Sequence, residues 1–376
     1  MAGIYIHIPF CKQACHYCDF HFSTSLKKKD ELIKSIIKEL FLRKNEIDEV
    51  IETIYFGGGT PSLLSQTELS SILNAIHEYF QVINRPEVTL EANPDDLSED
   101  ILIRLSKSPI NRLSIGIQSF FEADLKLMNR AHNASEALDC IETSKRYFDN
   151  ISIDLIYGIP GMSRDRWQKN LDLAVSLNIP HISSYALTVE PKTALKKMIE
   201  QGKVKPVDEE LAQTHYFQLI DTLDKAGFVN YEFSNFGKPN FFSKNNTAYW
   251  QGKSYLGVGP SAHSFNGNQR SWNVRNNTKY IKELANNKLP IERETLTIDD
   301  RYNEYIMTGL RTIWGINLDK IETDFSKKHR DYLMNQTKTL MDKGLLELNE
   351  NTLKVTRKGK FLNDGITSDL FLVNLS

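Results

Sequence analysis

Two hydrophobic patterns alternate along the first half of the chain. Short runs of β-branched residues alternate with longer amphipathic segments, which is the pattern of a parallel sheet with crossover helices. The predicted strands are Ile4–Ile8, Thr53–Phe56, Glu87–Glu91, Arg112–Ile117, Ile151–Ile156 and Ile182–Leu187. The predicted helices between them are Asp30–Arg43, Thr67–Phe80, Ser98–Lys107, Ala134–Phe148 and Asp165–Leu177. These consecutive βα units predict an α/β fold, either an open (βα)6 partial barrel or a full eight-unit barrel.

The pattern changes after the sixth predicted strand. Two further helices are predicted at Lys192–Gly202 and Val207–Gly227, which ends a first domain over residues 1–228. Residues 229–300 are rich in aromatic, asparagine and turn residues, and predict a folded loop that lines the barrel mouth or covers an open barrel edge. Residues 301–376 predict a smaller α-rich domain that ends in a helix and two short strands, as in a winged helix.

Composition narrows the function classes. The 376 residues include 40% hydrophobic residues, enough for a sizeable core. The formal net charge of −2 argues against a general nucleic-acid binder, so the winged helix is interpreted as a packing or substrate-covering domain. The sequence has no stretch of about 18 consecutive apolar residues, so no membrane span is predicted. Four cysteines without a signal-peptide pattern predict a cytoplasmic protein.

Three of the four cysteines lie within the stretch YIHIPFCKQACHYCDFHFS, at positions 11, 15 and 18. On a straight helix Cys11 and Cys18 would sit roughly 10 Å apart along the axis, so three sulfurs can share one centre only if the segment curls. Pro9 favours such a loop. Three thiolates are one short of the four that usually hold an iron–sulfur cluster, which leaves one iron open to a small molecule.

Other interpretations of these cysteines stay open at this point. A Cys3His zinc site could use His16 or His21, or the thiols could simply be buried. Cys140 lies in an amphipathic segment and is interpreted as a small core residue.

Unusual residues follow the carboxyl ends of the predicted strands, where barrels of this kind carry their working groups. The second strand runs into Gly57–Pro61, and no GK[ST] follows to make a phosphate loop. Glu91 and Gln118 end the next two strands, and Arg130 lies beyond them. Asp154 lies in the fifth strand. Each residue alone is equally well explained as a polar cap of a strand or helix.

The CxxxCxxC spacing, with YxHIPFC before it and CxYCDF within it, resembles the radical S-adenosylmethionine (SAM) superfamily. These motifs look like those of the branch that contains oxygen-independent coproporphyrinogen III oxidase and the heme chaperone HemW. The resemblance implies the (βα)6 partial barrel and a [4Fe-4S] cluster on Cys11, Cys15 and Cys18, whose open iron chelates SAM. It implies a SAM site formed by Tyr5, Tyr17, Gly58, Gly59, Thr60, Glu91, Gln118, Arg130, Asp154 and Ala186, with Tyr185 beside the last.

The resemblance also separates two functions. The oxidases carry CxxxCxxCxC and an amino-terminal extension, whereas this chain has Phe20 after Asp19 and reaches the first strand at once. HemW proteins carry HNxxYW where this chain has NNTAYW, so Asn245 stands in the place of the histidine and cannot be a strong axial heme ligand. The remaining heme or substrate candidates are Asn246, Tyr249, Trp250 and His263.

The expected function is therefore that of a heme chaperone without oxidase activity. The resemblance implies heme as cargo and heme-accepting proteins as partners, with membrane respiratory enzymes among the candidates. The alternative is an oxygen-independent coproporphyrinogen III oxidase that uses SAM radical chemistry.

Overall fold

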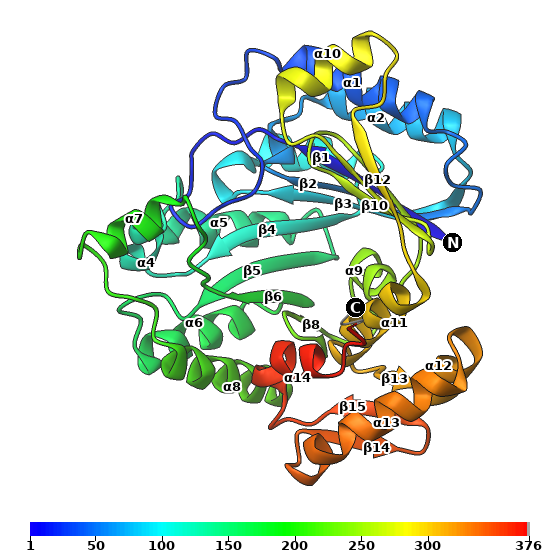
Figure 1. The fold of residues 1–376 in the computed structure, drawn as a ribbon. Coiled ribbons are helices and arrows are strands. Elements are labelled where there is room, and N and C mark those ends of the chain that lie inside the picture. The colour runs from blue at the N-terminus through cyan, green and yellow to red at the C-terminus, as the bar shows by residue number, and fades with distance from the viewer. Residues whose placement is uncertain (374–376) are drawn as a thin grey trace.

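The computed structural model describes residues 1–373, and its centre is a sheet of six parallel strands in sequence order (Figure 1). They are β1 (Ala2–Ile8), β2 (Ile51–Gly58), β3 (Val82–Ala92), β4 (Arg112–Gln118), β5 (Ile151–Tyr157) and β6 (His181–Ala186). All six predicted strands are confirmed. The complete sheet has twelve strands and ends in two edge strands, so the described residues form an open partial barrel rather than a closed one.

Helices cover the outer face of this sheet (Figure 1). They are α1 (Lys29–Leu42), α2 (Gln66–Tyr79), α3 (Glu99–Ser106), α4 (Glu122–Leu127), α5 (Ala134–Ser144), α6 (Arg164–Ser176), α7 (Ala194–Glu200) and α8 (Glu209–Lys225), with short 3-10 turns η1 (Pro61–Leu63) and η2 (Pro94–Asp96). Helices α2 and α5 begin at capping boxes, in which Ser65 and Asn133 each accept a backbone N–H while a glutamate reaches back. The short helix α4 was not predicted.

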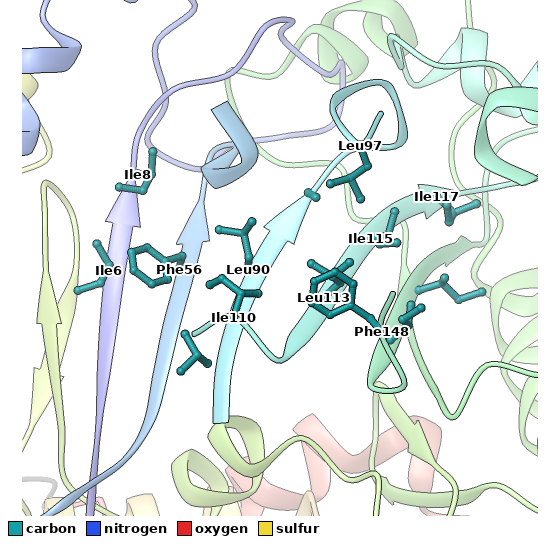
Figure 2. Packing of buried hydrophobic residues seen from close by; sticks show 14 of the residues in the cluster. Ile6, Ile8, Phe56, Leu90, Leu97, Ile110, Leu113, Ile115, Ile117 and Phe148 are labelled. Atoms are coloured by element: carbon teal, nitrogen blue, oxygen red, sulfur yellow. The ribbon is translucent and has the colours of Figure 1, made fainter. Parts of the chain in front are cut away.

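Strand residues alternate between two environments. In β4, Leu113, Ile115 and Ile117 are fully buried against the helices, and Figure 2 shows Leu113 and Ile115 beside the apolar residues of neighbouring strands. Arg112 and Ser114, at the alternate positions of β4, face the barrel interior and line a cavity there. The apolar core therefore lies between the sheet and its helices, and the barrel interior is polar.

Residues 229–300, predicted to be a loop, instead extend both edges of the sheet. Strands β8 (Asn235–Gly237) and β7 (Val229–Glu232) continue antiparallel from β6. On the other side, β9 (Tyr255–Val258) pairs parallel with β1, and β10 (His263–Phe265), β11 (Gln269–Asn273) and β12 (Ile291–Thr295) follow antiparallel. Helix α10 (Asn277–Ala285) packs on α1.

The NNTAYW motif forms helix α9 (Lys244–Trp250), which contacts β1 and β2. Asn245 accepts a hydrogen bond from the Thr53 hydroxyl at 3.1 Å, and its backbone N–H donates to Glu87 at 3.1 Å. Thr53 lies in the amino-terminal half of β2 and is paired with Glu87 on β3, so α9 closes the barrel floor and not its mouth (Figure 1).

The carboxyl-terminal unit has its own apolar cluster, centred on residues such as Tyr302, Leu333 and Leu353. Its elements are α11 (Ile298–Leu310), β13 (Ile316–Asn317), α12 (Leu318–Asp324), α13 (Lys327–Asp342), β14 (Leu346–Asn349), β15 (Thr352–Val355), η3 (Lys360–Leu362) and α14 (Asn363–Asp369). The helix α13 and the β14–β15 hairpin match the predicted winged-helix pattern. Arg311 joins this unit to the barrel, because it pairs with Glu232 at 3.1 Å and lies over the Trp250 ring at 4.7 Å.

No helix among the described residues combines the length and the apolar character needed to cross a bilayer.

Candidate functional site

The cysteine loop, residues 11–22, follows β1 at the carboxyl end of the sheet (Figure 1). Its two ends are tied together, since the Cys11 N–H donates to the Ser23 carbonyl at 3.1 Å and the Ser23 N–H donates to the Pro9 carbonyl at 2.9 Å. The middle is anchored by the His16 N–H, which donates to the Met128 carbonyl at 3.0 Å. The segment therefore curls, as sharing one centre among three sulfurs requires.

The three thiols of the loop are free, partly exposed and close enough to influence one another. Burial, together with Cys15 and Cys11, raises the pKa of Cys18 to about 11, and burial raises the pKa of Cys11 as well. Within residues 1–373 no three His, Cys, Asp or Glu side chains converge as a single metal ion would require, so the geometry gives no support to the zinc alternative. In a multi-iron cluster each thiolate would bind a different iron, so the three sulfurs would not have to meet at a single ion. Cys140 is buried in the core.

The glycine turn after β2 packs directly against this loop. Gly58 has a φ of 106°, and its N–H donates to Glu91 Oε2 at 3.1 Å. A Cβ at Gly59 would lie 2.6 Å from the Phe10 carbonyl oxygen. The glycines thus allow the end of β2 to touch the root of the cysteine loop, which fixes the loop relative to the sheet.

Arg130 connects the cysteine loop to the ends of three strands. Its guanidinium donates to Cys15 Sγ at 3.4 Å, to Asn93 Oδ1 at 2.5 Å and to the Gly116 carbonyl at 2.8 Å. Asn93 in turn donates to the Thr60 hydroxyl at 3.2 Å. One charged group therefore organises the predicted residues Thr60, Arg130 and Cys15 into a single network, and its Nε is left without a partner.

Gln118 lies beside this network in a strained conformation. Its φ is 69°, and the pairing of β4 with β5 shifts register between Gly116 and Gln118. A positive φ in a residue other than glycine is uncommon and, with the register shift, re-aims the side chain. A Cβ at Gly116 would lie 2.9 Å from Gln118 Nε2 and 3.2 Å from Arg130.

Glu91 and Asp154 face an interior cavity of about 250 Å³. Burial raises the pKa of Glu91 to about 7, helped by Asp154 and opposed by the Tyr55 hydroxyl, which donates to Glu91 at 2.7 Å. Burial likewise raises the pKa of Asp154 to about 6, although Ser114 donates to it at 3.3 Å. Both carboxylates can accept hydrogen bonds from a ligand, and their perturbed pKa values are typical of a functional site.

A second cavity of about 640 Å³, here called the side groove, runs along the inner face of β1. At the cluster end it is lined by Phe20 and His21, and at the floor by Asn245 and Asn246. Tyr249 and His263 also line it, from α9 and β10. The two cavities share Tyr5, Glu91, Asn245 and Asn246, so they adjoin along one wall.

The structure thus brings most of the predicted residues to two connected places. Tyr17 is partly buried beside Arg130. Burial raises the pKa of the Tyr17 phenol, and the positive charge of Arg130 partly offsets this rise. Tyr185 lines the interior cavity, and Ala186 is exposed next to it. Trp250 lines neither cavity; it packs on Arg311 instead.

Several lining residues escaped the sequence prediction. Tyr55, Arg112, Ser114 and Ser183 all line the interior cavity. They occupy alternate, inward-facing positions of strands that the sequence did predict. The signal that identifies them is the period of two along each strand, once the apolar residues have been assigned to the outer face.

Comparisons with known proteins agree with this geometry. The family model of the radical SAM superfamily matches residues 5–174, and that of the HemN C-terminal domain matches residues 296–362. The solved structure of coproporphyrinogen III oxidase (HemN) from Escherichia coli, described as a radical SAM enzyme, superposes with a TM-score of 0.86 at 23% identity, covering 98% of this chain and 90% of that one. At that identity the likeness shows the fold.

Two curated relatives match at higher identity. The heme chaperone HemW of Lactococcus lactis subsp. lactis (strain IL1403) is 33% identical over 374 residues, which cover 99% of this chain and 98% of the relative. The heme chaperone HemW of Bacillus subtilis (strain 168) is 31% identical, covering 97% and 98%. A radical SAM domain implies a [4Fe-4S] cluster and SAM. From the identity and coverage together, the chain belongs to the HemW family of radical SAM proteins.

Proposed function

We propose that this protein is a heme chaperone that binds heme in the side groove and delivers it to acceptor proteins. The observation that carries the proposal is the groove itself, a space of about 640 Å³ that opens beside the cysteine loop. Its volume suits a cofactor-sized ligand. Relatives that carry the name heme chaperone match almost the whole chain, which supports the same assignment.

The groove offers both apolar surface and a free imidazole. Phe20 and Tyr249 are exposed large side chains that line it, at 67% and 41% exposure. Exposed aromatic surface of this kind is a binding surface for a flat apolar ring. Phe20 holds the position at which the oxidase motif has a fourth cysteine, so it favours the chaperone over the alternative oxidase.

His263 is the proposed axial ligand of the heme iron in place of the motif histidine. His7 is buried and uses both ring nitrogens, one with the Tyr5 hydroxyl at 3.2 Å and one with the His21 carbonyl at 3.0 Å. His21 Nε2 is hydrogen-bonded to Asn277 at 2.7 Å. By contrast, the exposed His263 ring makes no side-chain hydrogen bond within the described part of the chain. Partial desolvation of the ring lowers the pKa of His263, which favours the neutral imidazole that binds iron.

The cluster and SAM are assigned to the adjoining site. Cys11, Cys15 and Cys18 would hold the cluster, which when bound supplies one electron to the SAM sulfonium. The residues proposed to contact SAM are Tyr5, Tyr17, Gly58, Gly59, Thr60, Glu91, Gln118, Arg130, Asp154 and Ala186. Glu91 and Asp154 suit the ribose hydroxyls or amino group of SAM, and Arg130 suits its carboxylate. Free thiols and an accessible cluster support a reducing, cytoplasmic setting.

A paired assay on one anaerobically reconstituted preparation tests the function. Hemin titration should give a saturable Soret band, and incubation with coproporphyrinogen III, SAM and a reductant should give no protoporphyrinogen IX. The His263→Ala variant should lose the ligand-dependent Soret shift, whereas His21→Ala serves as the matched groove variant and should keep it. Robust conversion of coproporphyrinogen III without stable hemin binding would refute the chaperone function and support the oxidase function.

A further inference from the structure

Arg112, the first residue of β4, is a buried cation without an ion pair, and it acts on Glu91 and Asp154, which face the same cavity, only at longer range. It is 2% exposed, and in the described residues no carboxylate lies within ion-pair distance of its guanidinium. Its one polar contact is with His181 Nδ1 at 3.4 Å, and its Nε has no partner. The equally buried Arg43 shows the usual arrangement, since it pairs with Glu39 and Glu46, each at 2.8 Å. A buried unpaired charge is costly, so its retention points to a ligand.

The surroundings of Arg112 form a polar pocket. Arg112 lines the interior cavity of about 250 Å³ together with Tyr55, Asn245 and Asn246. Thr89, its partner across β3 and β4, carries a second buried polar atom without a hydrogen bond. Thr89 does not itself line the cavity, so the donor that reaches a ligand there is the Arg112 guanidinium, which suits a carboxylate.

We propose that Arg112 binds a carboxylate in this cavity, and that this carboxylate is a propionate of the tetrapyrrole held in the side groove. The assignment rests on the proposed function. The two cavities share the walls formed by Tyr5, Glu91, Asn245 and Asn246, so a side arm of a ligand in the groove can enter the cavity.

Two acidic groups face the same cavity and have to be compatible with an anion. Burial raises the pKa of Glu91 to about 7 and of Asp154 to about 6. Each can therefore take up a proton near neutral pH when a carboxylate enters. The Asn246 amide also lines the cavity and can donate to the carboxylate, whereas the Ser114 and Ser183 hydroxyls already donate to Asp154 and Asn235.

The first test is stability without ligand. The Arg112→Met variant removes a cation that no carboxylate pairs, so its unfolding midpoint in urea should equal or exceed that of the parent protein. A large loss of stability would show that Arg112 is a structural cation for Glu91 and Asp154, and would overturn the proposal.

The decisive test changes the ligand and leaves the fold intact. Hemin and hemin dimethyl ester, in which both propionates are esterified, are titrated into the reconstituted parent protein, and SAM affinity is measured on the same preparation. Hemin should bind roughly ten- to hundredfold more tightly than the ester, as expected for hydrogen bonds between charged groups. In Arg112→Met the difference should disappear. In Lys253→Met, which alters a groove lysine that pairs with Glu52 at 3.4 Å, it should persist.

Each outcome has one reading. Equal binding of hemin and ester to the parent protein overturns the propionate assignment and leaves the chaperone function standing. A loss of discrimination in Lys253→Met in place of Arg112→Met puts the propionate at the groove rim and also overturns it. A loss of SAM affinity with unchanged hemin binding in Arg112→Met assigns the carboxylate to SAM. Failure of the parent protein to bind either porphyrin overturns the proposed function, and this assignment with it.

Discussion

The interior carboxylate of Glu91 gives the protein an unusual dependence of stability on pH. Its pKa is raised by burial from the ordinary 4.5 to about 7, even though the Tyr55 hydroxyl and the Gly58 N–H both donate to the carboxylate. Across this window the folded state keeps a proton that the unfolded chain releases. Stability therefore falls as pH rises from 4.5 to 7 and stays at the lower level above that.

The magnitude follows from the size of the shift. Moving a carboxyl pKa from 4.5 to about 7 corresponds to about 3 kcal/mol of folding free energy. Asp154 contributes in the same direction, since its pKa rises from 3.8 to about 6. The Glu91→Gln variant removes the ionisable group and keeps an acceptor for the two donors. We expect it to be more stable than the parent protein by up to about 3 kcal/mol at pH 8, and to differ little at pH 4.5.

Urea unfolding of the apoprotein, followed by tryptophan fluorescence at intervals from pH 4.5 to pH 8, measures this dependence. Glu294→Gln is the matched control, because Glu294 is an exposed glutamate on β12 and its loss should leave the pH profile of the parent protein unchanged. Parallel pH profiles for Glu91→Gln and the parent protein would refute the reasoning, as would a Glu91→Gln variant that is stabilised equally at pH 4.5 and pH 8.

Three further predictions concern the cysteine loop and the core. Alanine at any of the three loop cysteines should abolish the brown colour and the four irons of the reconstituted protein, whereas Cys140→Ala should keep both, as measured by absorbance and iron content. Gly59→Ala should lower iron content because its Cβ would lie 2.6 Å from a backbone carbonyl of the loop root, whereas Gly365→Ala, with nothing within 4 Å, should not. Arg43→Met leaves Glu39 buried without its cation and should cost about 3–5 kcal/mol in urea unfolding, the opposite of Arg112→Met; an unchanged midpoint would contradict this.

The sequence was sufficient for the parts of the fold that depend on local pattern. The parallel strands were found because each is a short β-branched run bounded by a long amphipathic helix. The cysteine loop was found because its spacing is rare. The winged-helix pattern was found because the β14–β15 hairpin follows directly on a helix.

The parts that failed depend on long-range pairing. Strands β7–β12 are each only three to five residues long, and β9 is a strand only because it pairs with β1, more than 200 residues away. Helix α9 carries the motif NNTAYW, but its place at the barrel floor is set by the contacts of Asn245 with Thr53 and Glu87. These contacts cannot be predicted from the local sequence pattern. Arg112 begins a predicted strand, and its burial without an ion pair is visible only in three dimensions.

The separation between an apolar outer face and a polar interior has a consequence for how this scaffold can change. The folding free energy comes chiefly from side chains such as Leu113 and Ile115, which never meet a ligand. The residues proposed to contact a ligand alternate with them along the same strands. Substitutions at the inward positions can therefore change which ligand binds, with little effect on the folding free energy. A different ligand then requires different interior side chains but not a different fold.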